Sequence, residues 1–153
     1  MLTTAHFIVA GLTVLTVLLV VALHYEAFVR LSGWLRRPGP DELKMRERLL
    51  ALVLSLIVLH VAEIWLFALT GWGLTEFVPG AGGIHAPYPV SFLDQVYLSA
   101  ATFTTVGYGD VYPHGPIRFL FGTEALVGFA LITWSASLTF LEMQRHWSTS
   151  GDD

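Results

Sequence analysis

One short segment, residues 104–110, carries residue types suited to holding a bare cation. It reads Thr104-Thr105-Val106-Gly107-Tyr108-Gly109-Asp110. A cation that leaves water needs other oxygens in place of its hydration shell, and backbone carbonyls directed at a shared axis supply them. Such a run of carbonyls requires unusual backbone angles, which Gly107 and Gly109 permit. One chain offers too few oxygens, so this chemistry predicts four copies around the axis.

Three ionisable residues, His60, Glu63 and Glu124, lie inside long apolar stretches, where such groups are costly and mark functional positions. His60 and Glu63 share a helix face because they are three residues apart. A rise of about 1.5 Å per residue puts Glu63 and Glu124 roughly 10–12 Å below one surface. We predict a polar cluster of all three behind segment 104–110. It acts as a proton sensor or, in the simpler interpretation, as a structural network.

The elements that must position these residues are three long apolar runs, at about 7–23, 49–70 and 117–141. The chain has 153 residues, of which 54% are hydrophobic and 13% charged, whereas soluble domains are about 25% charged. A helix of about 20 apolar residues crosses a bilayer, so each run predicts a membrane-spanning helix. A cleaved signal peptide explains the first run poorly, because no positive residue precedes it.

A short apolar stretch, 91–103, leads directly into segment 104–110. Ser91 and Asp94 have the spacing of an N-terminal capping box, which predicts a helix start. Thirteen helical residues rise only about 20 Å, too little to cross the bilayer, so the helix is predicted to be re-entrant. Its C-terminal end carries a partial negative charge that favours a cation nearby. The Gly- and Pro-rich residues 71–90 before it are predicted to form an exposed loop.

Charge asymmetry predicts the orientation in the membrane. Six of the eight basic residues fall between the first two runs: Arg30, Arg36, Arg37, Lys44, Arg46 and Arg48. The positive-inside rule places that loop in the cytoplasm. The N-terminus and residues 71–116 are then outside, and the C-terminus is cytoplasmic.

The segment Thr105-Val106-Gly107-Tyr108-Gly109, between two spanning runs, resembles the filter of small prokaryotic potassium channels of the two-transmembrane pore-loop family. The resemblance covers roughly 49–145 and leaves out the first helix. It implies that K⁺ is bound by backbone carbonyls, and by the threonine hydroxyl, at Thr105, Val106, Gly107 and Tyr108. Gly109 then closes the filter at the outer mouth. Tyr108 differs from the acidic residue of related non-selective pores.

The same resemblance suggests how the filter is supported. Thr104 and Asp110 flank it, and many members brace it with aromatic pairs in the pore helix. Here we predict that Tyr97 hydrogen-bonds Asp110. Ala101 stands where some members carry a glutamate, so that buried acid pair is absent. Gly128 lies at the depth of the family's gating hinge, although close helix packing through a small residue explains it equally well.

The predicted fold is an all-α membrane protein with three transmembrane helices, a re-entrant pore helix and a selectivity-filter loop, assembled as a tetrameric pore. Its predicted segments are an extra N-terminal helix (1–28), a basic cytoplasmic loop and helix start (29–48), the pore module (49–145) and a short cytoplasmic tail (146–153). Within the pore module we expect an outer helix (49–70), an outer loop (71–90), the pore helix (91–103), the filter (104–110) and an inner helix (116–143).

The predicted function is passive K⁺ conduction by a homotetramer in the plasma membrane. The alternatives are a weakly selective cation channel and a non-conducting membrane subunit that retains the fold. The sequence offers no phosphate-binding loop, nucleophile constellation or cysteine, so we expect no enzyme activity, nucleic-acid partner, small-molecule substrate or cofactor beyond permeant K⁺. The first helix lacks regularly spaced arginines, which argues against a voltage sensor.

Overall fold

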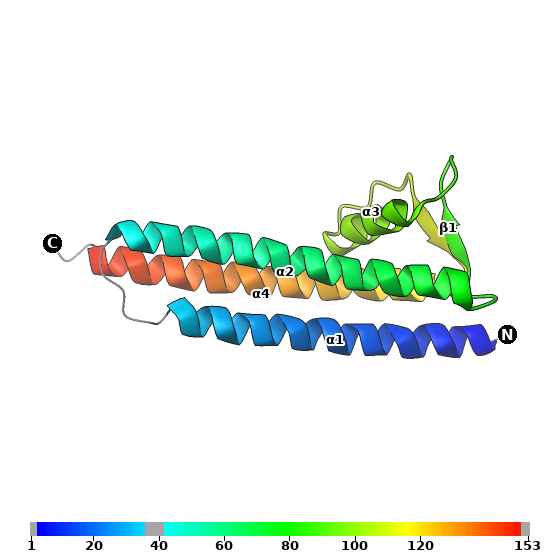
Figure 1. Cartoon of the computed structure of the whole chain (residues 1–153), viewed down its shortest axis with the longest axis horizontal. Coiled ribbons are helices and arrows are strands. Elements are labelled where there is room, and N and C mark those ends of the chain that lie inside the picture. The colour runs from blue at the N-terminus through cyan, green and yellow to red at the C-terminus, as the bar shows by residue number, and fades with distance from the viewer. Residues whose placement is uncertain (1–2, 36–41, 151–153) are drawn as a thin grey trace.

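The computed structural model describes residues 3–35 and 42–150. Three long helices, α1 (Thr4–Leu35), α2 (Glu42–Phe77) and α4 (Arg118–Ser150), run side by side, and a short helix α3 (Phe92–Phe103) lies beside one end of them (Figure 1). Apolar stretches long enough to cross a membrane cover Thr4–Leu35, Arg46–Phe77 and Arg118–Arg145. The predicted fold class, an all-α membrane protein, is therefore confirmed.

The short helix starts where the capping signal predicts. Ser91 is its N-cap: the Ser91 hydroxyl accepts from the Asp94 amide at 3.3 Å, and the Asp94 carboxylate accepts from the Ser91 amide at 2.7 Å. The side-chain and backbone hydrogen bonds from Ser91 hold the pKa of Asp94 below its usual value. The helix has 12 residues and a rise of about 18 Å, so it does not cross a bilayer.

The spanning helices are longer than predicted. The outer helix, expected to end at 70, continues to Phe77. A Cβ at Gly71 would lie 3.2 Å from the Phe121 ring, and the Gln95 side chain donates to Thr75 at 3.4 Å. The last two turns of α2 are thus packed against α3 and α4 instead of ending in water.

Segment 29–48, expected to hold a basic loop and a helix start, does contain the start of α2, at Glu42, but the first residues of the segment belong to α1. Helix α1 runs on to Leu35, because Leu35 is buried in a second core cluster with Leu52, Leu56, Leu59 and Leu138. Residues 1–2, 36–41 (with the predicted loop residues Arg36 and Arg37) and 151–153 lie outside the described part of the chain. The inner helix, expected at 116–143, begins at Arg118 and continues to Ser150.

Two short strands, absent from the predicted fold, pair on either side of α3 and segment 104–110. Strands β1 (Gly83–His85) and β2 (Tyr112–His114) pair antiparallel, with Ile84 opposite Pro113. Just beyond them Gly82 and Gly115 meet so closely that a Cβ on Gly82 would lie 2.0 Å from the His114 carbonyl oxygen. The pairing joins residues before the pore helix to residues after the filter, a contact between distant positions that local sequence pattern does not report.

The main core lies where α3 enters the groove between α2 and α4. Its fully buried side chains come from all three helices and include Phe67, Leu74, Phe103 and Leu120. Helix α1 packs alongside through Val9 and Val20, and the Thr16 and Thr70 hydroxyls lie 2.9 Å apart between α1 and α2. Helix α3 is therefore held with its C-terminal end inside the bundle.

The substitution Ser91→Ala tests the capping box. It removes the hydroxyl acceptor at the start of α3, so we expect the melting temperature of the detergent-solubilised protein to fall by a few degrees. Ionised Asp94 stabilises the cap at any pH above the pKa that Asp94 has in the unfolded chain. This stabilisation is lost as the pH falls through the lower pKa of the folded chain. The difference in melting temperature between Ser91→Ala and wild type therefore becomes smaller in acid. Ser137→Ala, on an exposed face of α4, is the matched control; an equal loss in both variants contradicts the cap.

Candidate functional site

Segment 104–110 leaves the C-terminal end of α3 with an irregular backbone. Every second residue has a positive φ: 59° at Thr105, 55° at Gly107 and 83° at Gly109. The two glycines adopt such angles freely, but Thr105 is β-branched and pays a strain of about 1–3 kcal/mol. It is the one non-glycine residue with positive φ in the described chain. The expected unusual angles are present at both glycines.

The start of this segment is tied back to the last turn of α3. The Thr104 amide donates to Ala100 at 3.1 Å, the Thr105 amide to Thr102 at 2.9 Å, and the Gly107 amide to Ala101 at 3.0 Å. Three carbonyls that a free helix end leaves without partners are thereby used. The segment begins directly on the negative end of the α3 dipole.

All seven residues of the segment are exposed in the single chain. Val106 and Tyr108 have exposed fractions of 54% and 73%, and a Cβ on Gly107 or Gly109 would meet nothing within 4 Å. An irregular backbone at membrane depth needs protein or a water-filled path around it. The segment thus has little protein around it in the single chain.

The outer end of the segment is braced by a side chain of α3. The Tyr97 hydroxyl donates to both carboxylate oxygens of Asp110, at 3.0 and 3.1 Å, so the predicted hydrogen bond is present. The Tyr97 ring also stacks on Tyr108, with centroids 6.2 Å apart and planes 9° apart. Desolvation first, then the hydrogen bond to Asp110, raises the pKa of Tyr97 above its ordinary value.

The inner helix touches the base of the segment through a glycine. A Cβ on Gly128 would lie 2.2 Å from the Phe103 carbonyl oxygen and 2.8 Å from the Phe103 Cα. Only a residue without a side chain lets α4 approach the end of α3 this closely. Of the two interpretations of Gly128, close packing has direct structural support, and the hinge stays a prediction.

Glu124 does not join His60 and Glu63, so the predicted three-residue cluster is wrong in its membership. Glu124 is fully buried and bonds the hydroxyl of Ser99 on α3. The same hydroxyl reaches the Ile64 carbonyl oxygen at 2.8 Å. The Ser99 hydroxyl has one proton and lies within reach of two acceptors, the Ile64 carbonyl oxygen and Glu124 Oε1. This joint links α2, α3 and α4.

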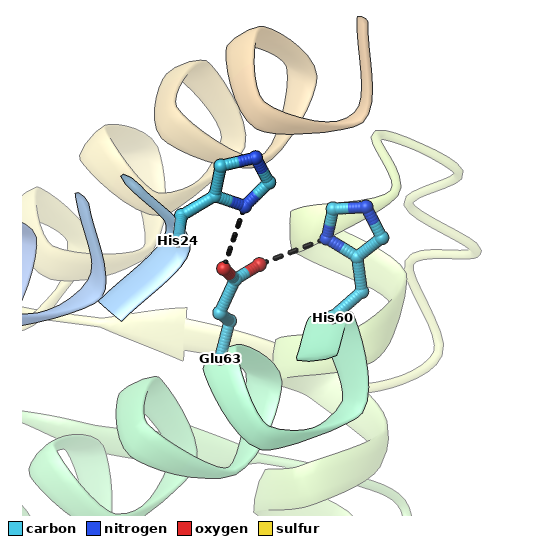
Figure 2. Close-up of side chains that lie close together, drawn as sticks. All are labelled: His24, His60 and Glu63. Atoms are coloured by element: carbon cyan, nitrogen blue, oxygen red, sulfur yellow. Dashed lines mark hydrogen bonds and ion pairs between the residues drawn. The ribbon is translucent and has the colours of Figure 1, made fainter. Parts of the chain in front are cut away.

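The true partner of Glu63 and His60 is His24 of α1, which sequence analysis left out of the cluster (Figure 2). Each carboxylate oxygen of Glu63 contacts one imidazole Nδ1, His24 at 2.9 Å and His60 at 2.8 Å. The depths explain the separation from Glu124. Glu63 is about 21 Å from the end of α2, because α2 continues to Phe77, whereas Glu124 is about 9 Å from the start of α4.

Comparison with known proteins shows which family shares this part of the sequence. Residues 49–145 match the family described as ion channel. The chain belongs to the ion channel family. The matched part of the channel contains α3, segment 104–110, Gly128 and Glu124, and it leaves out α1.

Two curated relatives share part of the channel's sequence. Protein LctB of Geobacillus stearothermophilus is 32% identical over 87 residues, which are 50% of this chain and 65% of that protein. Protein LctB of Bacillus caldotenax is 50% identical over 38 residues, which are 25% of this chain and 28% of that protein. The channel thus covers less than two thirds of either relative. No solved structure matches it significantly.

Tyr97→Phe tests the brace on the channel. The variant keeps the ring but loses both hydrogen bonds to Asp110, so we expect current to decay severalfold faster during sustained opening. Patch recordings from reconstituted channels measure the decay. Tyr88→Phe is the matched control, since the Tyr88 hydroxyl donates to Asp94, at 3.3 Å, and not to Asp110. Unchanged decay in Tyr97→Phe contradicts the brace.

Gly128→Ala separates packing from hinge motion. The new methyl group meets backbone that cannot rotate away, so we expect a loss of about 1–3 kcal/mol in stability together with reduced current. Gly122→Ala, on the same helix with nothing within 4 Å of its Cβ, is expected to gain up to about 1 kcal/mol. Thermal unfolding in detergent measures both. Altered gating with unchanged stability in Gly128→Ala favours the hinge instead.

Proposed function

We propose that the chain is one subunit of a homotetrameric channel that conducts K⁺ passively across the plasma membrane. The observation that carries the proposal is the alternating positive φ at Thr105, Gly107 and Gly109, in a segment that starts on the C-terminal end of α3. Carbonyls that face one axis require such a backbone. The proposed K⁺ ligands are the carbonyls of four consecutive residues, with the Thr105 hydroxyl: Thr105, Val106, Gly107 and Tyr108.

The exposure of the segment supports assembly into a ring. Val106 and Tyr108 are the apolar residues of the segment and are more than half exposed, although they stand beside a well-packed core. Four copies around an axis cover these side chains and supply rings of four carbonyls. Thr104, Asp110 and Tyr97 then act as the support of the filter, and Gly109 closes its outer mouth.

The charge distribution supports the proposed orientation. Helix α1 begins in the half of the bundle beside which segment 104–110 lies, whereas the end of α1 and the start of α2, which residues 36–41 connect, lie at the other end with the end of α4 (Figure 1). Six of eight basic residues belong to that connection and its flanks. By the positive-inside rule we place this end in the cytoplasm and the filter outside.

Two alternatives remain part of the proposal. The filter has the brace of Tyr97 on Asp110 but Ala101 in place of the glutamate that forms a buried acid pair in some family members, which favours weaker selectivity as the second candidate. A bi-ionic reversal potential with K⁺ on one side and Na⁺ on the other separates the two: a value near zero supports the weakly selective channel. A non-conducting subunit gives no current at all.

Flux into liposomes tests the proposal directly. Purified protein with the mass of four chains is expected to dissipate a K⁺ gradient. Gly107→Ala is expected to abolish K⁺ flux, because alanine strains the backbone at a φ of 55°, while packing elsewhere is spared because its Cβ meets nothing within 4 Å. Gly80→Ala is the matched control: Gly80 also has a positive φ, 85°, but lies outside the filter. Tetrameric wild-type protein without K⁺ flux overturns the proposal, and equal flux in both glycine variants removes the filter assignment.

A further inference from the structure

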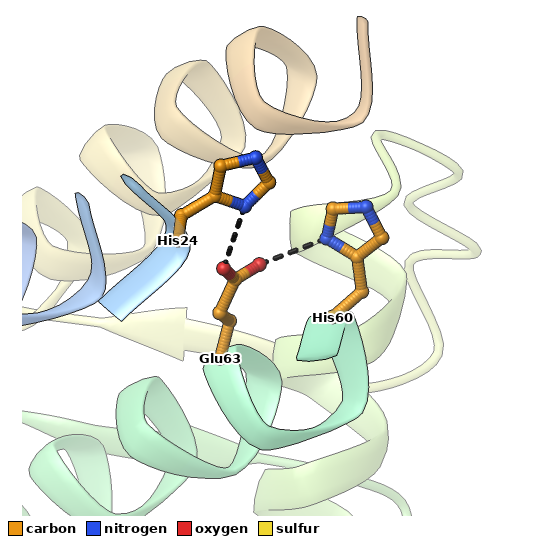
Figure 3. Close-up of polar contacts among 3 residues, drawn as sticks. All are labelled: His24, His60 and Glu63. Carbon is orange, nitrogen blue, oxygen red and sulfur yellow. Dashed lines mark hydrogen bonds and ion pairs between the residues drawn. The ribbon is translucent and has the colours of Figure 1, made fainter. Parts of the chain in front are cut away.

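The contact between α1 and the pore module has the composition of a metal site. Figure 3 shows His24 from α1 and His60 and Glu63 from successive turns of α2, with both imidazoles directed at one carboxylate. The two rings stack at 5.6 Å, with planes 28° apart. One ligand atom from each residue lies within 4.8 Å of the others.

The buried carboxylate of Glu63 makes this cluster energetically unfavourable unless a positive charge compensates it. The side chains of His24 and Glu63 are fully buried, and His60 is 17% exposed. A carboxylate inside a spanning helix is unfavourable unless a cation or proton compensates it. Two neutral imidazoles donate hydrogen bonds but leave the charge of Glu63 in place.

We propose that His24, His60 and Glu63 bind one divalent transition-metal ion of the Zn²⁺ class. Two imidazoles and one carboxylate are a ligand set that Zn²⁺ accepts, with a fourth position left for water, whereas Mg²⁺ and Ca²⁺ prefer oxygen ligands alone. Tetrahedral bonds of about 2.0–2.1 Å place ligand atoms about 3.3 Å apart. The present Nδ1–O contacts of 2.8 and 2.9 Å have to widen to reach that spacing, and the wider separations within the group, which extend to at most 4.8 Å, have to shorten.

The surroundings of the site hold the ligands in place and leave one way in. Trp134 of α4 lies 5.3 Å from the His24 ring, which restricts its rotation. His60 is the partly exposed ligand, and it lines a groove of about 370 Å³ between α2 and α4. Ser135 and Thr139 also line that groove among mainly apolar side chains, and His60 is the ligand of the three that it reaches.

Metal binding here has a direct route to the filter. His24 lies on α1, outside the matched residues 49–145, so the ion ties the additional helix to the pore module. The His60 ring lies 5.8 Å from Phe103, the last residue of α3 before segment 104–110. An occupied site fixes α1 against the base of the filter. Metal binding itself stands independently of the proposed K⁺ conduction.

Cobalt titration of the full chain tests the site. Metal-stripped protein with no histidine tag, in detergent, is expected to bind one Co²⁺ per chain with the visible absorption of a tetrahedral ion, and Zn²⁺ is expected to displace it. Glu63→Gln and His60→Gln are each expected to weaken binding by at least about tenfold. His85→Gln, an exposed histidine of β1, is the matched control and keeps wild-type affinity.

A second measurement guards against misfolded variants. Zn²⁺ is expected to raise the melting temperature of wild type and His85→Gln but not of Glu63→Gln, because an ion that binds only the folded chain stabilises it. Folded wild-type protein that binds no Co²⁺ or Zn²⁺ overturns the proposal and leaves a cluster neutralised by a proton. Binding that survives in both Glu63→Gln and His60→Gln overturns it as well.

Discussion

The backbone of residues 104–110 has no hydrogen-bonded ladder of its own, and the rest of the structure is arranged to hold it. Its first amides use the last carbonyls of α3, and its far end is held by Tyr97 through Asp110. At the start of the segment, α4 packs directly against the Phe103 carbonyl, because residue 128 is glycine and has no side chain in the way. The strained Thr105 persists because both sides of the turn are fixed independently.

The spanning helices carry their polar groups as two separate joints at different depths. Ser99 and Glu124 connect the pore helix to α2 and α4, and Glu63 connects α2 to α1 through two histidines. In an apolar medium each buried polar group needs a partner, so each joint favours one helix register over its neighbours. Sliding one helix by a residue breaks at least one joint.

Features that depend on residues close together in the sequence were predicted correctly. The Ser91 and Asp94 spacing located the start of α3, apolar runs located the three spanning helices, and the glycines of segment 104–110 indicated its backbone. The pairing of Tyr97 with Asp110, which the family resemblance suggested, is present. His24 was missed as a partner because nothing in the spacing of α2 refers to α1. The end of α2 was predicted too early because a glycine such as Gly71 often marks the end of a helix. In this structure Gly71 lies within α2 and lets Phe121 pack closely against it. Glu124 was assigned to the wrong cluster because the misplaced helix end gave a wrong depth.

The paired strands beyond α2 have a consequence for chain length. Ala81 accepts from the Ile117 amide at 2.8 Å, and Gly82 and Gly115 meet beside β1 and β2, so the outer excursion is closed at its neck. The contacts at this neck set the distance between the end of α2 and the start of α4. The residues between β1 and α3 do not set it. Once a loop is closed, doubling its length adds only about 0.6 kcal/mol of entropy cost. The exposed rim at 87–90 is therefore free to lengthen or change in sequence while the geometry of the pore stays constant.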